Sequence, residues 1–467
     1  MNFVIELPKL ILYFDINKTL IFGDRAKNQP FESSVLSLVC ENAWGTVNPK
    51  TKKWTLASKE LSFECPKEGL VNYSQYLKMV YPKKNDIDEP DMQKRVKTNK
   101  ENKITRESEM DKFVDTGKPG EQLKEVFADI LNKLKVPQYV MDKVEKGEVS
   151  EFFQKLYKNG YVFIFLSLYF TMIKLQQEGR DFAIIFRSFG DDSEVVSQEF
   201  NAFCQGLHPI FDGSNPSFPK VYFDGTHGSK NYMITKDNLG LFYRYSIDLS
   251  HISFVRGVHK RLEEKPFDLL NEYKQQIESK EVEVINGGKN IYSFIQKNIF
   301  TGKYNSFIMG DDYDIWSKNC ERTEYSKVLL NDPYNYQVHQ FFFDDNITEN
   351  NHSIVDCRNV VTEETMDRNF IKGKYILKAD AIAAGIDPNY FYDRIKEAEE
   401  LRKDDMRKEN KRTLGIDTKK AISDLINRGM FLYETEGKGK QSLTDFFGNF
   451  IIANKSSIEK KLSLSES

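Results

Sequence analysis

The chain has 467 residues, of which 40% are hydrophobic and 13% aromatic, enough for two or three cooperating units with sizeable cores. A net charge of −3 gives no overall case for nucleic-acid binding, so a nucleic-acid partner is not expected. The 5 cysteines are scattered and form no C-x-x-C pair, which argues against a disulfide framework or a zinc site and favours a reducing, cytoplasmic compartment.

The first element predicted from the sequence is a buried strand that ends in a carboxylate. Residues 10–14, LILYF, are followed directly by Asp15, a pattern typical of a parallel strand that is covered on both faces. No basic segment precedes this run, so a secretory signal peptide is not expected. Side chains at the carboxyl ends of such strands form the usual binding site of an open α/β sheet.

Residues 26–159 differ in composition and are interpreted as an insertion. Short apolar runs are interrupted there by a strongly charged stretch within residues 82–125, which begins PKKNDIDEPDMQKRVKTNKENK. Few apolar residues and alternating charge favour either a mobile loop or a solvated helix for this stretch.

The α/β pattern resumes at about residue 160. The apolar run 161–173, YVFIFLSLYFTMI, is shorter than the ~20 residues that a membrane-spanning helix requires, so we predict a buried helix over 162–177 and no membrane span. A strand is predicted over 182–186 and is followed by Ser188. Polar residues at 191–193 are then predicted to cap the next helix.

Residues 213–299 contain short aromatic strands and are interpreted as a second, β-rich insertion with the character of a separate lobe. A further strand is predicted at 306–309, and a helix that contains Lys327 at about 321–330. The strand 339–343 ends in Asp344 and Asp345, and 353–356 is one more candidate strand.

The end of the chain, residues 376–467, is predicted to be a helical extension. Its sequence is highly charged from 396 to 412, and its last residues, SSIEKKLSLSES, are typical of a frayed, disordered tail. The charged helices are a candidate surface for protein partners.

Three strand ends share one form, in which an apolar run stops at a polar residue that can face a ligand. They are FDINKTL at 14–20, IIFRSFG at 184–190 and FFFDDN at 341–346. With Lys327 they supply a carboxylate, a hydroxyl, an ammonium and a carboxylate pair. Phosphoryl transfer needs such a set, because the negatively charged phosphoryl group is stabilised by Mg²⁺, a cation and hydrogen-bond donors. Mg²⁺ in turn prefers hard oxygen ligands.

The order and spacing of these segments resemble the four motifs of the haloacid-dehalogenase-like (HAD) hydrolase superfamily. The resemblance implies a Rossmann-like α/β core with a mostly parallel sheet, interrupted by cap-type insertions and followed by C-terminal helices. The discontinuous core would comprise 1–25, 160–212 and 300–375, with a cap insertion at 26–159 and the second insertion at 213–299. The caps would select the substrate, a phosphorylated small molecule or a phosphoprotein.

The resemblance also implies roles for the first motif. Asp15 would be the nucleophile that carries an aspartyl-phosphate. Asn17 would offer its backbone carbonyl to Mg²⁺, while its side chain occupies the position of the general acid/base. Thr19 matches the threonine of the motif.

The other motifs supply the remaining site residues. Ser188 resembles the hydroxyl residue that binds phosphoryl oxygens, and Lys327 the lysine of the third motif, with Lys318 as a rival. Asp344 and Asp345 match the carboxylate pair that would complete the Mg²⁺ site.

Asn17 is a departure, since most phosphatases of this superfamily carry Asp at that position. An amide cannot act as an acid or base near neutral pH, and general acid/base catalysis is typically worth about 10²- to 10⁴-fold. We therefore predict a Mg²⁺-dependent phosphatase of monoesters or acyl phosphates that is slow, that is restricted to good leaving groups or that forms a long-lived phospho-Asp15. Asp24 or Asp311 remains open as a substitute for the missing carboxyl group.

Two other hypotheses stay open. One is a catalytically attenuated HAD-like protein that acts as a phospholigand-binding or protein-interaction module, which Asn17 favours. The other is a structural protein that uses the charged C-terminal helices as a contact. Each strand-end residue also has a simpler interpretation as a turn or helix-capping residue.

Overall fold

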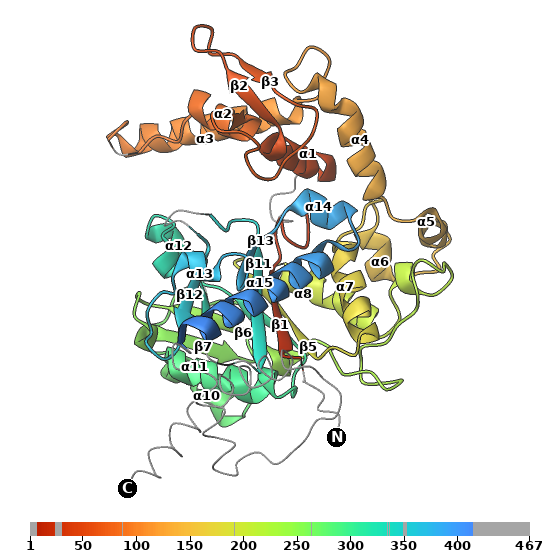
Figure 1. Cartoon of the computed structure of the whole chain (residues 1–467), viewed down its shortest axis with the longest axis vertical. Helices are drawn as coiled ribbons and strands as arrows, with labels where there is room; N and C mark the ends of the chain where they lie inside the picture. Colours follow the sequence, from red (N-terminus) through yellow and green to blue (C-terminus); the bar gives the residue numbers. More distant parts are fainter. Residues whose placement is uncertain are drawn as a thin grey trace.

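The computed structural model describes residues 7–23, 30–85, 87–190, 192–262, 264–333, 335, 337–348 and 353–413, with side chains up to residue 403 in the last range. The chain is a mixed α/β protein with a large, mostly parallel central sheet, as the sequence predicts (Figure 1). The predicted disordered tail lies outside the described residues.

The central sheet has 8 strands in the order β13-β11-β1-β5-β9-β6-β7-β8. The strands from β13 to β6 are parallel to one another, whereas β7 pairs antiparallel with both β6 and β8. The strands are β1 (Lys9–Asp15), β5 (Phe182–Ser188), β6 (Leu239–Arg244), β7 (Ile252–Arg256), β8 (Glu283–Asn286), β9 (Ser306–Gly310), β11 (Val338–Asp344) and β13 (Ile376–Lys378).

Strand β1 lies inside the sheet and is buried along its whole length. Because successive side chains point to opposite faces, Leu10, Leu12 and Phe14 pack into one hydrophobic core, while Ile11 and Tyr13 pack into another on the opposite face. This double burial explains why the strand is apolar without alternation.

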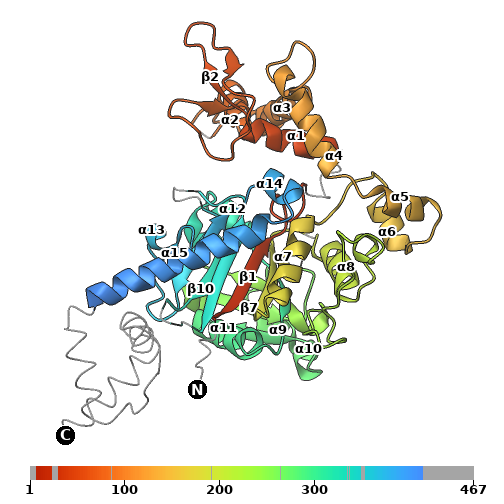
Figure 2. The same ribbon diagram turned by 45° about the vertical axis from the view of Figure 1, so that its right-hand side comes forward.

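One face of the sheet is covered by α7 (Leu166–Gln177), α8 (Ser193–Cys204) and α15 (Tyr390–Thr413), and the other by α11 (Gly288–Ile295) and the two-stranded parallel sheet of β10 (Lys327–Asn331) and β12 (Val355–Asn359). In Figure 2, α15 crosses the strands obliquely. The predicted apolar helix is α7, whose buried positions confirm that it belongs to the core. Within the described residues, no helix combines the length and apolar character that crossing a bilayer requires.

Residues 30–133 form a lobe with its own antiparallel sheet, β3-β2-β4, and lie on the side of the central sheet at which β1 ends (Figures 1 and 2). Within the charged stretch, Met92–Asp111 form a helix of 20 residues without a buried position, so the solvated-helix alternative is confirmed for this part. The elements are α1 (Phe31–Asn42), β2 (Trp44–Val47), β3 (Trp54–Leu56), β4 (Val71–Asn72), α2 (Tyr73–Val80), α3 (Met92–Asp111) and α4 (Lys124–Lys133).

Short elements complete the chain. The remaining helices are α5 (Gln138–Glu145), α6 (Glu151–Leu156), α9 (Leu269–Glu272), α10 (Lys274–Glu278), α12 (Tyr313–Lys318), α13 (Arg368–Ile371) and α14 (Ala381–Ile386). Single 3₁₀ turns lie at Glu121–Leu123, Pro209–Phe211, Lys236–Asn238, Leu249–His251 and Thr323–Tyr325, and a π turn at Gln296–Phe300.

Three sequence-based predictions are wrong. Lys327 does not lie in a helix: it begins strand β10, because its segment pairs with β12 and packs its apolar residues under the central sheet. The strands of 213–299 do not form a separate lobe either. Strand β6 pairs with β9, and β7 and β8 follow it, so this segment extends the central sheet. Strand β13, within the predicted helical extension, joins the opposite edge.

Helix α15 is fixed to the sheet by an aromatic triad. The Phe391 ring lies edge-on to Phe14 and Phe343, with centroid distances of 5.0 and 5.2 Å, and Phe391 is 0% exposed. Replacing it with alanine leaves a cavity, so Phe391→Ala is expected to lower the free energy of unfolding by about 3–5 kcal/mol in urea denaturation followed by circular dichroism. The control Leu401→Ala, exposed on the same helix, should change it by less than about 0.5 kcal/mol. Equal changes in the free energy of unfolding in the two variants would contradict this packing.

Candidate functional site

Asp15 and Asp344 lie side by side at the carboxyl edge of the sheet. They end the neighbouring parallel strands β1 and β11, in which Phe14 is opposite Phe343. From β1 the chain proceeds to β5 on one side of the sheet and later returns to β11 on the other side. In open α/β sheets this topological switch point is where ligands bind.

The ammonium group of Lys327 lies between these two carboxylates. It donates hydrogen bonds to Asp15 Oδ1 and, at 2.8 Å, to Asp344 Oδ2, and the side chain is 1% exposed. Burial alone lowers the pKa of Lys327, but Asp15, Asp344 and Asp311 outweigh burial, so the pKa lies above its usual range. The lysine is therefore charged at neutral pH.

The strand β10 that carries Lys327 is attached to the sheet by buried polar side chains. Gln340 of β11 donates to the Leu330 carbonyl at 3.0 Å. Arg187, at the end of β5, donates to the Val328 carbonyl at 3.0 Å and forms a buried ion pair with Asp311. Arg187 thus fixes the start of β10 against the ends of β5 and β9, Gln340 attaches the rest of β10 to β11, and the Lys327 ammonium is held between the strands.

Three carboxylates could hold a metal ion. Asp15, Asp344 and Asp345 each offer an oxygen atom, and these atoms lie within 4.8 Å of one another. Burial raises the pKa of Asp345 well above its usual range, and the neighbouring Asp344 carboxylate adds to this effect. Burial, with a further contribution from Asp344 and against Lys327, raises the pKa of Asp15 to about 7. Both carboxyl groups are therefore harder to ionise in the metal-free protein, whereas a bound cation would favour their ionised forms, and hard oxygen donors of this kind fit Mg²⁺.

A tight loop after β1 places the rest of the first motif. The Leu20 and Ile21 amides both donate to the Ile16 carbonyl, and Lys18 adopts a left-handed conformation with φ 58°. The hydroxyl of fully buried Thr19 accepts a hydrogen bond from the Asp345 amide at 3.2 Å. Thr19 therefore ties the first motif to the carboxylate pair.

Lys18 links this loop to the lobe through an ion pair of 2.9 Å with Glu41 of α1. A second link joins the Lys378 ammonium at the end of β13 to the Phe63 ring, whose centroid lies 4.3 Å away. Among its contacts with the core, the lobe therefore has two close to the carboxylates.

Ser188, Asn17 and Asp192 converge at the end of β5. The Ser188 hydroxyl accepts a hydrogen bond from the Gly190 amide at 2.9 Å, and Asn17 Nδ2 donates to Asp192 Oδ2 at 3.1 Å. A side-chain carbon at Gly190 would lie within 3.7 Å of all three side chains. Asp192 was expected only as a helix cap, but it makes no side-chain cap bond to α8, so its contact with Asn17 is a feature that sequence reasoning missed.

The rival candidates are placed elsewhere or are already paired. Lys318 lies on the exposed face of α12, 3.9 Å from Asp314, so Lys327 is the lysine that contacts the carboxylates. The buried carboxylate of Asp311 accepts two hydrogen bonds from Arg187 and is therefore not a free substitute for the acid/base group. Asp24 lies outside the described residues.

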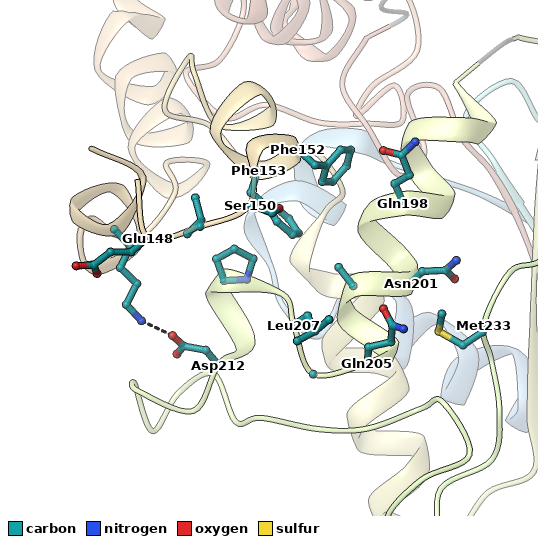
Figure 3. A pocket seen from close by; sticks show the side chains of 15 residues that line it. Glu148, Ser150, Phe152, Phe153, Gln198, Asn201, Gln205, Leu207, Asp212 and Met233 are labelled. Carbon is teal, nitrogen blue, oxygen red and sulfur yellow. Dashed lines mark hydrogen bonds and ion pairs between the residues drawn. The ribbon is translucent and has the colours of Figure 1, made fainter. Parts of the chain in front are cut away.

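A cavity of about 700 Å³ lies between α6 and α8, away from these residues (Figure 3). Its lining mixes apolar side chains such as Phe152 and Leu207 with polar ones, and Lys143 forms an ion pair with Asp212 there. None of the predicted site residues lines this cavity.

No family model, no curated protein and no solved structure matches this chain.

The raised pKa of Asp15 makes a prediction about stability in metal-free buffer. Because the folded chain binds this proton more tightly than the unfolded chain, the contribution of Asp15 to stability is present at low pH and is lost as the pH rises through about 7. Asp15→Asn has no such proton, so its melting temperature relative to wild type should be higher at about pH 8 than at about pH 5. Asp129→Asn, an exposed carboxylate on α4, is the control. If the difference in melting temperature between Asp15→Asn and wild type does not change with pH, the raised pKa of Asp15 is contradicted.

Proposed function

We propose that the protein is a Mg²⁺-dependent phosphohydrolase of the HAD type that transfers the phosphoryl group through Asp15. The observation that carries this proposal is the cluster of Asp15, Lys327, Asp344 and Asp345 at the switch point of a parallel sheet. The motif order in the sequence supports it, because all four motif segments meet at one edge of the sheet.

In the proposed reaction an Asp15 carboxylate oxygen forms a bond to phosphorus. The bond between phosphorus and the leaving oxygen breaks, and the leaving group departs with the electron pair. Lys327 orients Asp15 and offsets negative charge on the phosphoryl oxygens, and the Ser188 hydroxyl donates a hydrogen bond to one of them. Water then attacks phosphorus, breaks its bond to Asp15 and releases inorganic phosphate.

Asp15, Asp344, Asp345 and the Asn17 backbone carbonyl would hold Mg²⁺. The bound ion would supply electrostatic stabilisation of the phosphoryl oxygens. The contacts of the lobe at Glu41 and Phe63, close to the carboxylates, support a role for the lobe in substrate selection, and the substrate would be a phosphorylated small molecule or a phosphoprotein. A cytoplasmic location stays a prediction from cysteine usage.

Asn17 leaves the proposed mechanism without a proton donor for the leaving group. Its amide group donates to Asp192 and cannot supply a proton to the leaving group. The enzyme would therefore act slowly on alkyl phosphates and faster on substrates whose leaving group needs no proton. The same observation favours one alternative function, an attenuated HAD-like module that binds a phosphorylated ligand or a protein partner without turnover.

The first test is phosphate release from acetyl phosphate with and without Mg²⁺. The wild type should release phosphate only with Mg²⁺, and Asp15→Asn should lose on the order of 10⁴-fold or more in kcat, because it lacks the nucleophile. Asp129→Asn, with the same change of charge on a remote helix, should retain full activity. Release that is independent of Mg²⁺, or that persists in Asp15→Asn, would contradict the mechanism. If the wild type releases no phosphate, the proposed hydrolysis is wrong, and the alternative function, a module that binds a phosphorylated ligand or a protein partner, remains.

A second test restores the missing group. Asn17→Asp places a carboxyl group beside Asp192, and the like charges raise the pKa of the pair, which suits a proton donor. Turnover of an alkyl phosphate such as glycerol phosphate should rise by about 10²-fold or more, measured as phosphate release. Asn17→Leu, which adds no acid, should bring no gain. An unchanged rate in Asn17→Asp would show that the missing acid does not limit the reaction.

A further inference from the structure

Three aromatic side chains, here called the aromatic wall, lie beside the Lys327 ammonium. Phe189 directly follows Ser188, while Tyr313 and Trp316 lie on α12, which follows β9. The Phe189 ring stacks on Trp316 with a centroid distance of 5.3 Å and an interplanar angle of 17°, and it meets Tyr313 edge-on at 5.6 Å. Two strand ends that belong to the candidate site thus contribute one aromatic surface.

The aromatic wall is adjacent to the nucleophile. Lys327 Nζ lies 4.9 Å from the centroid of the Phe189 ring, and the same atom donates to Asp15 and Asp344. One ammonium group therefore separates the ring from the carboxylate that would take the phosphoryl group. A single aromatic ring attached to the phosphate would therefore be large enough to reach the aromatic wall.

The aromatic wall is also incompletely covered by the protein. Tyr313 is 49% exposed, and Phe189 and Trp316 are only partly buried against the core. Among the described side chains, the indole N–H of Trp316 is a buried donor without a hydrogen-bond partner. A partly open aromatic surface beside a charged centre is typical of a ligand site, in which apolar side chains bind and a few polar groups orient.

Asn17 independently restricts the leaving group. Without a proton donor at that position, the leaving oxygen must depart as an anion. A phenol ionises at about pH 10, well below water at about 15.7, so a phenolate departs more readily than an alkoxide. Aryl phosphates therefore satisfy both constraints, because they carry a good leaving group and a ring directly attached to it.

We infer that the substrate class is an aryl phosphate monoester, with its phenyl ring against Tyr313, Phe189 and Trp316; this rests on the proposed function. In the first step the bond between phosphorus and the phenolic oxygen breaks as the bond to Asp15 forms, and the phenolate leaves with the electron pair. Water then hydrolyses the aspartyl-phosphate, and the proton released with phosphate balances the one that the phenolate takes up. Phosphotyrosine and small phenolic phosphates share this chemistry.

The test compares substrates with and without a ring in the Tyr313→Ala variant. Loss of one aromatic contact should lower kcat/KM for phenyl phosphate by about 3- to 10-fold, while kcat/KM for acetyl phosphate, a good leaving group without a ring, should change by less than about 2-fold. Tyr304→Ala is the matched control, because Tyr304 precedes β9 at the opposite edge of the sheet and should affect neither substrate. Circular dichroism verifies the fold of both variants.

The outcomes separate this inference from the proposed function. Wild type should hydrolyse phenyl phosphate faster than glycerol phosphate, and a phosphotyrosine peptide tested in parallel distinguishes a protein substrate from a small phenolic one. If acetyl phosphate is hydrolysed but phenyl phosphate is no better than glycerol phosphate, or if Tyr313→Ala lowers both substrates equally, the aryl inference is wrong and the phosphohydrolase stands. If no substrate is hydrolysed, both are overturned.

Discussion

The buried ammonium of Lys327 holds together two carboxylates, Asp15 and Asp344, that end neighbouring strands and would otherwise repel each other. Removing any of these charges from water is costly unless each finds a partner, so the arrangement requires β1, β11 and β10 to be positioned together. Much of the surrounding structure serves this requirement. Arg187 and Gln340 fix β10, and the double burial of β1 fixes the position of Asp15.

The chemistry proposed for the site follows from two features, the cluster of carboxyl groups and the lack of a proton donor at position 17. Three carboxyl groups gather beside the buried ammonium of Lys327, and their hard oxygen atoms suit a divalent cation. The site has no acid at position 17, and the contact between Asn17 and Asp192 leaves that position as an amide donor. The proposed slow turnover and preference for good leaving groups follow from this departure, and the aromatic wall is a separate feature that fits the same substrates.

Buried strands and their ends could be predicted from the sequence, because an uninterrupted apolar run that stops at a polar residue has few other structures available. Strands β1, β5 and β11 and the residues Asp15, Ser188 and Asp344 follow from this pattern. The strand that contains Lys327 could not, since the short run VLL suits a helix as well as a strand and only pairing with β12 decides between them. The same holds for β6, whose partner β9 is distant in the sequence, and for Asp192, Tyr313 and Trp316, which reach the site through tertiary packing alone.

The central claim is that Asp15, Asp344 and Asp345 form a Mg²⁺ site. Isothermal titration calorimetry of the metal-free protein with MgCl₂ tests it directly and does not depend on turnover. The account predicts that each chain binds a single Mg²⁺ ion, and that Asp344→Asn and Asp345→Asn weaken this binding while Asp129→Asn does not. Binding that is unaffected by the first two substitutions, or absent from the wild type, would contradict it.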